Sequence, residues 1–216
     1  MKFKLYTSKS EKKEALLDGL LHAKNNKEIL NKITVLQNEI SVGFNTKVVA
    51  IAGINDDELS AYFAKAFADA YSMNGSSSLI IDANLYNQQL KNILSSSEHQ
   101  EIGLSIGFDS KGKGRQFIFV DNKTDAWCLD NEVYPSTVYK SGAIQRMIKE
   151  NTAKYDHFIL ILPSLKDHKE ISLLADIIES IVLVSQKDVT TKERIFDAIQ
   201  YLAEMKMPLA KTVVLK

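Results

Sequence analysis

The chain has 216 residues, of which 45 % are hydrophobic, so it can bury one sizeable core. Its 27 basic residues balance 27 acidic ones, which disfavours nucleic acid, a membrane surface or a highly acidic partner. A single cysteine, Cys128, rules out an internal disulfide and fits a reducing compartment, and no apolar stretch reaches the roughly 18 to 20 residues of a membrane span or resembles a signal peptide. We therefore expect a cytoplasmic protein with no direct membrane insertion and no nucleic-acid partner.

Residues 1–45 are expected to form an N-terminal helical segment, with a helix at about residues 11–41. Next come short aliphatic runs without polar alternation, as in strands buried on both faces of a parallel sheet. These runs cover residues 48–52, 79–81, 158–162, 181–184 and 212–215. Between the first two, Leu59, Phe63 and Phe67 belong to an apolar stripe with spacings of three and four, which predicts a helix over residues 57–73.

Further helices are expected at residues 137–153, 168–179 and 191–206, the last opened by a capping box from Thr190 to Glu193. Residues 95–136 interrupt the pattern, because polar turn residues flank an aromatic strand at 117–120, and we interpret this segment as a loop-rich insertion. Strands that alternate with helices predict an α/β fold with a three-layer, doubly wound, mostly parallel sheet. We expect residues 1–216 to form a single domain.

In such a sheet, ligands bind at the carboxyl ends of the strands, so the junction after the first strand is the place to look for a site. A phosphate loop there needs glycines whose amides surround the anion, a lysine for the β- and γ-phosphates, and a serine or threonine for magnesium. Residues 53–61 read Gly-Ile-Asn-Asp-Asp-Glu-Leu-Ser-Ala, which has none of these groups at the expected places.

The flanks of this junction resemble a known family. The strand at residues 47–52, the helix after it, Gly75 and the sequence Leu-Ile-Ile-Asp-Ala-Asn-Leu at 79–85 are similar to the bacterial tyrosine kinases of capsular and exopolysaccharide synthesis. Those kinases belong to the MinD and ParA group of deviant P-loop ATPases. The resemblance covers residues from about 28 to 216 and implies a P-loop NTPase-like fold.

The resemblance also marks the positions where nucleotide chemistry has been lost. The chain can be aligned with the family's phosphate loop without a gap, and the family's two other motifs are partly kept. Asp57 and Leu59 fall on its two glycines, Glu58 on its glutamate, Ser60 on its lysine, Ala61 on its magnesium-binding serine, Asp82 and Asn84 on the two acids of its second motif, and Ile161 on the acid of its third. We interpret these eight positions as vestigial nucleotide-binding positions and expect no catalytic residue, metal or bound cofactor.

Loss of a lysine contact to phosphate costs about 1.5 to 3 kcal/mol, and loss of the amide cradle adds at least one such bond. The affinity for ATP should therefore fall by roughly two or more decades. Acids in a first helical turn are usually caps, so we expect Asp56 and Asp57 to cap the helix in place of a phosphate, and Glu58 to be no acid/base partner of Asp57. The role of Asp82 stays open: it is either a remnant magnesium ligand or a structural acid.

Three functions follow from this resemblance. The first is a non-catalytic pseudokinase that acts as an adaptor or regulator in capsular or exopolysaccharide assembly. Its partner would be a membrane-bound chain-length regulator, an active paralogue or a second copy, and such a regulator would hold it at the inner face of the membrane. The second is an active ATPase or tyrosine kinase that uses ATP and magnesium, with Lys47, Lys65 or Lys187 as a displaced lysine. The third is a ParA- or MinD-like positioning protein, which needs a basic DNA-binding face or an amphipathic membrane helix, and neither is evident in the sequence.

Overall fold

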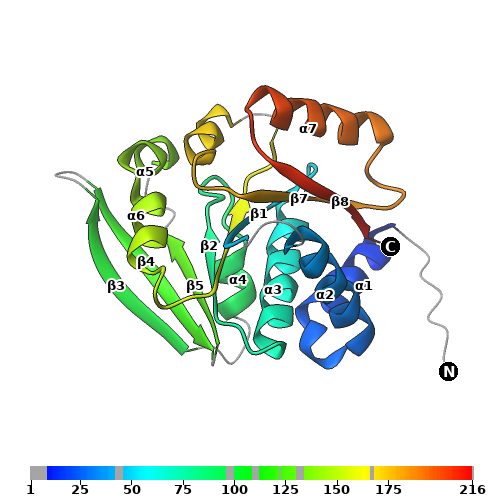
Figure 1. The fold of residues 1–216 in the computed structure, drawn as a ribbon, viewed down its shortest axis with the longest axis horizontal. Coiled ribbons are helices and arrows are strands. Elements are labelled where there is room, and N and C mark those ends of the chain that lie inside the picture. Colours follow the sequence, from blue (N-terminus) through cyan, green and yellow to red (C-terminus); the bar gives the residue numbers. More distant parts are fainter. Residues whose placement is uncertain are drawn as a thin grey trace.

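The computed structural model describes residues 9–41, 46–95, 100–108, 112–121, 123–129, 134–165 and 168–215. Its centre is an eight-stranded sheet in the order β3-β4-β5-β2-β6-β1-β7-β8 (Figure 1). The strands are β1 (Val48–Gly53), β2 (Ser78–Asp82), β3 (Gln100–Phe108), β4 (Gly112–Asp121), β5 (Thr124–Leu129), β6 (His157–Leu162), β7 (Ser180–Gln186) and β8 (Leu209–Leu215). Strands β5, β2, β6, β1, β7 and β8, in this spatial order, run parallel, and β4 and β3 extend the sheet beyond β5 as antiparallel strands.

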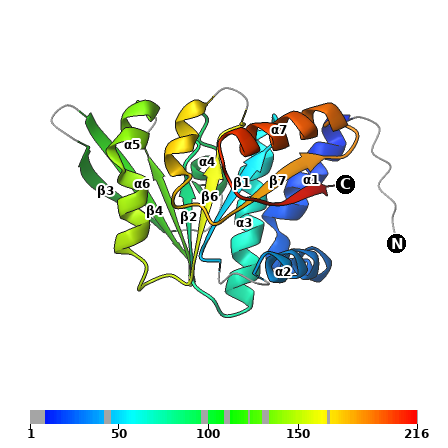
Figure 2. The ribbon, with the colours of Figure 1, turned by 45° about the horizontal axis from the view of Figure 1, so that its top comes forward.

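Helices cover both faces of this sheet, which makes three layers (Figures 1 and 2). Helices α1 (Lys9–Leu21), α2 (Lys27–Ser41), α3 (Asp57–Met73) and α4 (Leu90–Ser95) pack on one face. Helices α5 (Pro135–Ser141), α6 (Ala143–Glu150), η3 (Lys169–Leu174) and α7 (Lys192–Glu204) pack on the other. The predicted α/β class with a mostly parallel, doubly wound sheet is confirmed.

Strand β1 shows why the aliphatic runs lie inside the sheet. Val49 and Ile51 contribute to the core under α3, whereas Ala50 and Ala52 contribute to the core on the opposite face. Since successive side chains of a strand point to opposite faces, a strand between two helical layers must be apolar at every position. The five predicted strands are all present, and the predicted helix at 57–73 is α3 with the same bounds.

The other predicted helices are shorter or broken. The N-terminal helical segment divides at η1 (Ala23–Asn25), and the Asn26 side chain then accepts bonds from the amides of Glu28 and Ile29, which starts α2. Gly142, with a φ of 68°, separates α5 from α6 where one helix was expected at 137–153. The helix expected at 168–179 is the 3₁₀ helix η3 over only six residues.

The prediction of a loop-rich insertion at 95–136 is wrong for most of that segment, because it contains β3, β4 and β5. Apolar residues alternate along β3 at Ile102, Leu104 and Ile106, the period of a strand with one covered face, but interspersed glycine and polar residues masked that signal. Trp127 on β5 is 1 % exposed and belongs to a main core.

The cap of α7 is displaced by one residue from its predicted place. Thr191 is the N-cap and accepts a bond from the Arg194 amide at 3.3 Å, while the Thr190 hydroxyl accepts one from the Gln186 amide. Thr190 therefore stabilises the turn before the helix. Within the described residues, none of the helices is long and apolar enough to cross a bilayer.

Candidate functional site

The junction between β1 and α3 is a tight turn. A Cβ atom on Gly53 would lie 2.0 Å from the carbonyl oxygen of Asp56, so only glycine fits there. Asn55 takes the left-handed conformation, with a φ of 57°, and α3 starts only two residues later. The Asp56 carboxylate accepts a bond from the Leu59 amide at 3.0 Å and is the N-cap of α3. Asp57 and Leu59, which align with the family's two glycines, therefore lie inside the first helical turn.

The side chains at the next two aligned positions, Ser60 and Ala61, are buried. Ser60, in the place of the lysine, has no exposed surface, and its hydroxyl donates to the carbonyl oxygen of Asp57 at 2.7 Å. Ala61, in the place of the magnesium-binding serine, is also fully buried. Neither side chain offers a group to a ligand outside the helix.

We expected Asp57 to cap the helix. Its carboxylate instead accepts bonds from residues that follow β6 and β2. Its Oδ1 atom accepts a bond from the Ser164 amide at 2.9 Å, just beyond β6. Its Oδ2 atom accepts one from the Asn87 side chain at 3.2 Å, in the loop after β2. The carboxylate thus connects the start of α3 to the segments that follow β6 and β2.

The cation at this junction is Lys13 of α1, which the sequence analysis did not single out. Its Nζ atom lies 3.0 Å from Asp56 Oδ2 and 2.9 Å from Glu58 Oε2. Partial burial lowers the pKa of Lys13, but the hydrogen bonds and charges of the two carboxylates outweigh it and raise the pKa above its ordinary value. Lys13 is 43 residues from Asp56 in the chain, so no local motif could have identified the contact.

Asp82 is fully buried, and its two oxygens accept bonds from the amides of Asn84 and Leu90, both at 3.2 Å. Burial, with a smaller contribution from the nearby charge of Asp57, raises the pKa of Asp82 to about 7, although both amides favour the carboxylate. Asn84 is 1 % exposed; its Oδ1 atom accepts the Asn87 amide, and its Nδ2 atom has no partner among the residues that the structure describes. These contacts support the structural interpretation of Asp82.

The described residues around Asp82 and Asn84 do not form a metal-binding arrangement. Ile161 on β6 is buried in the core and paired in register with Ile51 of β1, so the position of the third motif's acid has no ligating oxygen. In the described part of the chain, no three His, Cys, Asp or Glu side chains are placed to hold a metal ion.

The three lysines considered as displaced phosphate ligands lie away from the junction. The Lys65 ammonium lies 2.6 Å from Asp69 Oδ2 on α3, and the Lys47 ammonium donates to the Thr152 carbonyl beside the amino end of β1. Lys187 lines a separate hollow with Gly19 of α1. None of the three is among the residues that line the junction.

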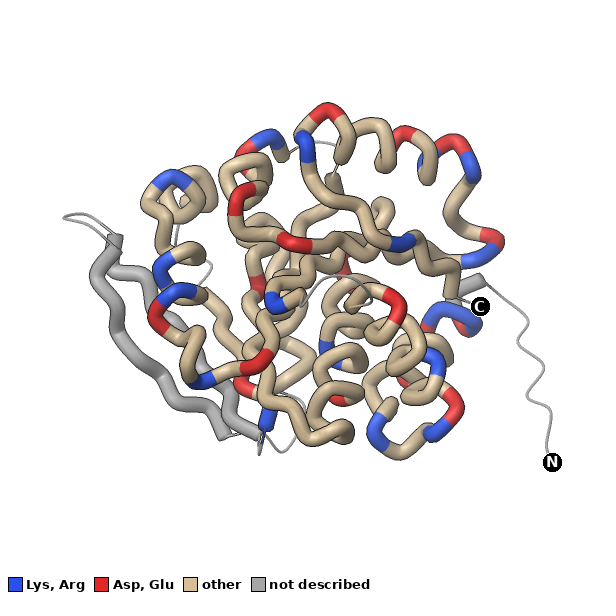
Figure 3. Tube along the Cα trace, viewed as in Figure 1, with Lys and Arg blue, Asp and Glu red and all other residues tan. Residues whose placement is uncertain are grey.

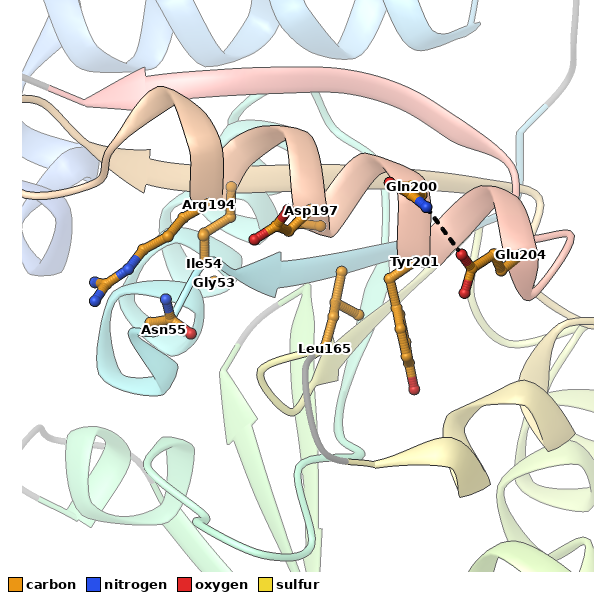
Figure 4. Close-up of a pocket in the computed structure, with 10 residues that line it drawn as sticks. Gly53, Ile54, Asn55, Leu165, Arg194, Asp197, Gln200, Tyr201 and Glu204 are labelled. Carbon is orange, nitrogen blue, oxygen red and sulfur yellow. Dashed lines mark hydrogen bonds between the residues drawn. The ribbon is translucent and has the colours of Figure 1, made fainter.

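Two hollows meet at Asn55 on the carboxyl edge of the sheet. The junction hollow, of about 580 Å³, is lined by Lys13, Asn55, Asp56, Asp57, Glu58, Asn87, Gln89 and Ser164. The α7 groove, of about 480 Å³, is lined by Gly53, Ile54, Asn55, Leu165, Arg194, Asp197, Ala198, Gln200, Tyr201 and Glu204 (Figure 4). Together their walls carry five acids against two bases, whereas acidic and basic positions are interspersed over the helices seen in Figure 3. This edge therefore attracts cations more than anions.

Solved structures with the same fold include tyrosine kinase domains. The kinase domain of Escherichia coli tyrosine kinase ETK has a TM-score of 0.68 at 15 % identity over 86 % of this chain and 74 % of its own. The VpsO kinase domain has a TM-score of 0.68 at 15 % identity, over 97 % of this chain and 99 % of its own. The chimerical protein CapA2B2 has a TM-score of 0.69 at 16 % identity over 85 % and 83 %. No protein-family model matches the chain, and no curated protein matches it by sequence.

Proposed function

We propose that this chain is a pseudokinase that acts through protein contacts, as a non-catalytic adaptor or regulator in capsular or exopolysaccharide assembly. The fold that it shares with tyrosine kinase domains supports the family, and the altered junction supports the loss of activity. Its partner would be a membrane-bound chain-length regulator, an active paralogue or a second copy. The first of these would bring the protein to the inner face of the membrane.

One observation carries the proposal: the first turn of α3 occupies the positions where the family binds phosphate. The Leu59 amide, which could donate to an anion, already donates to Asp56. A helix N-terminus attracts anions through its free amides and its dipole, but here Asp56, Asp57 and Glu58 supply the negative charge themselves. A triphosphate would have to approach three carboxylates, of which Asp56 and Glu58 share Lys13 and Asp57 accepts bonds from Ser164 and Asn87.

Isothermal titration with magnesium-ATP tests this proposal. We expect no binding up to about 1 mM nucleotide, because the lost contacts weaken ATP by at least two decades. An active kinase domain titrated under the same conditions is the positive control. Binding in the micromolar range would show that the proposal is wrong.

The position of Lys13 favours a second candidate function, that of an ATPase or kinase in which Lys13 replaces the missing phosphate-loop lysine. Its ammonium lies in the junction hollow, within 3.0 Å of Asp56 and Glu58. Turnover of ATP should then fall to background in Lys13→Ala and in Asp82→Ala. Background turnover in the wild type would eliminate this candidate.

A further inference from the structure

The α7 groove is a formed hollow whose two walls are held in place independently. One wall is the turn after β1, where the Ile54 amide donates to the Val184 carbonyl at 2.9 Å and Gly53 is fixed by the close approach of Asp56. Leu165 continues this wall, and the Ser164 amide beside it is bound by Asp57. The opposite wall is α7, whose start is capped by Thr191.

Helix α7 presents one stripe of side chains to the groove. Arg194, Asp197, Tyr201 and Glu204 follow one another at spacings of three, four and three, which places them on one face of the helix. Figure 4 shows them in this order along α7, above Asn55 at one end and Leu165 further along. Ten residues of helix span about 15 Å, the length of four or five residues of extended chain at roughly 3.3 Å each.

The charged side chains of this stripe form no ion pair with any residue that the structure describes. Neither Asp197 nor Arg194 has a side-chain hydrogen bond or ion pair with a residue that the structure describes. Glu204 accepts one bond, from the neutral Gln200 amide at 3.2 Å. Two carboxylates are therefore available to a cation, with the half-buried Tyr201 ring between them as an apolar surface, whereas Leu165 lines the groove but is only 5 % exposed.

We infer that the α7 groove binds a short extended segment of a protein partner, in which Lys or Arg residues flank a large apolar side chain. The basic residues meet Asp197 and Glu204, and the apolar side chain lies against Tyr201. Arg194 disfavours a further base beyond the one that meets Asp197. The inference rests on the proposed adaptor function and names the chemistry of its partner.

A peptide fits these observations better than a compact amine. The two carboxylates lie seven residues apart on the helix, about 10 Å, so one small cation cannot reach both. A Lys or Arg side chain at each end of a short peptide can, while its middle residue fills the apolar part of the groove. The acidic junction hollow, which adjoins at Asn55, extends the same preference for cations.

Selection from a displayed random octapeptide library against the full chain tests the inference. We expect the selected peptides to share Lys or Arg beside a large apolar residue and, once synthesised, to bind in the micromolar range by fluorescence anisotropy. No peptide tighter than about 100 μM, or binders without basic residues, would overturn the inference. Competition by spermidine at micromolar concentration would assign the groove to small amines instead and overturn it too.

A pair of matched double variants locates the binding. Asp197→Asn with Glu204→Gln should weaken the selected peptides by about tenfold, since both ion pairs are lost. Glu193→Gln with Glu150→Gln makes the same charge change at exposed acids outside the groove and should leave the affinity unchanged. Equal affinity for both double variants would show that the peptides bind elsewhere.

Magnesium-ATP added to the peptide complex separates this inference from the proposed function. Peptide binding without any effect of ATP supports both. Displacement of the peptide by ATP would contradict the proposed function while leaving the peptide site in place. Absence of both peptide and nucleotide binding would overturn only the inference.

Discussion

At the scale of single residues, the candidate site is defined by acids whose roles differ although they lie close together. Asp56 caps a helix, Asp57 accepts bonds from residues that follow β6 and β2, and Asp82 is buried beneath them between two backbone amides. The three acids differ in exposure, and Asp82 is the one that is fully buried. Burial disfavours its carboxylate and raises its pKa.

Asp82→Asn tests this assignment through pH. Asp82 ordinarily ionises near 3.8, but its pKa in the folded protein is about 7. Between these values the folded protein keeps a proton that the unfolded chain has released, so stability falls as pH rises, by at most about 4 kcal/mol, and levels off above pH 7. The variant lacks this fall, although its amide nitrogen cannot accept a backbone bond, so its deficit relative to wild type should shrink from pH 5 to pH 8 in urea denaturation.

Asp156→Asn is the matched control. Bonds from the Ser77 amide and hydroxyl lower the pKa of Asp156, so its contribution to stability is lost only as pH falls through the acid range. Its deficit should stay constant between pH 5 and pH 8. A constant deficit for the Asp82 variant as well would mean that Asp82 ionises normally in the folded protein.

At the scale of elements, α1 packs against α3, and an ion-pair contact links α1 to the start of α3. In this contact Lys13 of α1 lies between Asp56, the N-cap of α3, and Glu58, and all three side chains are only partly buried. A partly exposed ion pair contributes little free energy, but here one cation serves two anions that would otherwise repel each other. We therefore expect this contact to matter more for the position of α1 than for the stability of the whole fold.

Lys13→Gln should lower the free energy of unfolding by about 0.5 to 1 kcal/mol and raise amide hydrogen exchange across α1. Lys12→Gln, one residue away on the same helix and without an ion pair to any residue that the structure describes, should change neither quantity. High salt should reduce the difference between wild type and Lys13→Gln, because screening weakens the pair. Equal exchange of α1 in the two variants would argue that apolar packing alone holds this helix.

At the scale of the whole molecule, one sheet separates the two hydrophobic cores. It includes the antiparallel strands β3 and β4, which lie in the segment that we had interpreted as an insertion. Trp127 on β5 stands opposite Ile81 of β2 and Ile118 of β4, so it lies where the parallel and antiparallel parts meet. A continuous sheet favours cooperative unfolding of both parts. We propose on this basis that residues 1–216 behave as one domain.

Fluorescence of Trp127, the only tryptophan, should report this cooperativity. We expect urea denaturation followed by this fluorescence and by far-ultraviolet circular dichroism to give one transition with the same midpoint. The native emission should be blue-shifted, because the ring is 1 % exposed. Two separate midpoints would indicate that β3, β4 and β5 unfold as a unit of their own.

The sequence alone determined five of the six parallel strands and α3, because an unbroken aliphatic run or a stripe at helical spacing is a local consequence of what each element buries. It also determined which groups are missing at the junction, since side-chain identity needs no coordinates. Only the tertiary structure decided that Lys13 occupies this junction, that Asp57 joins Ser164 and Asn87, and that α7 forms a groove with the turn after β1. Those contacts join residues from about 30 to well over 100 positions apart, and their partners are selected by how the layers pack rather than by any pattern along the chain.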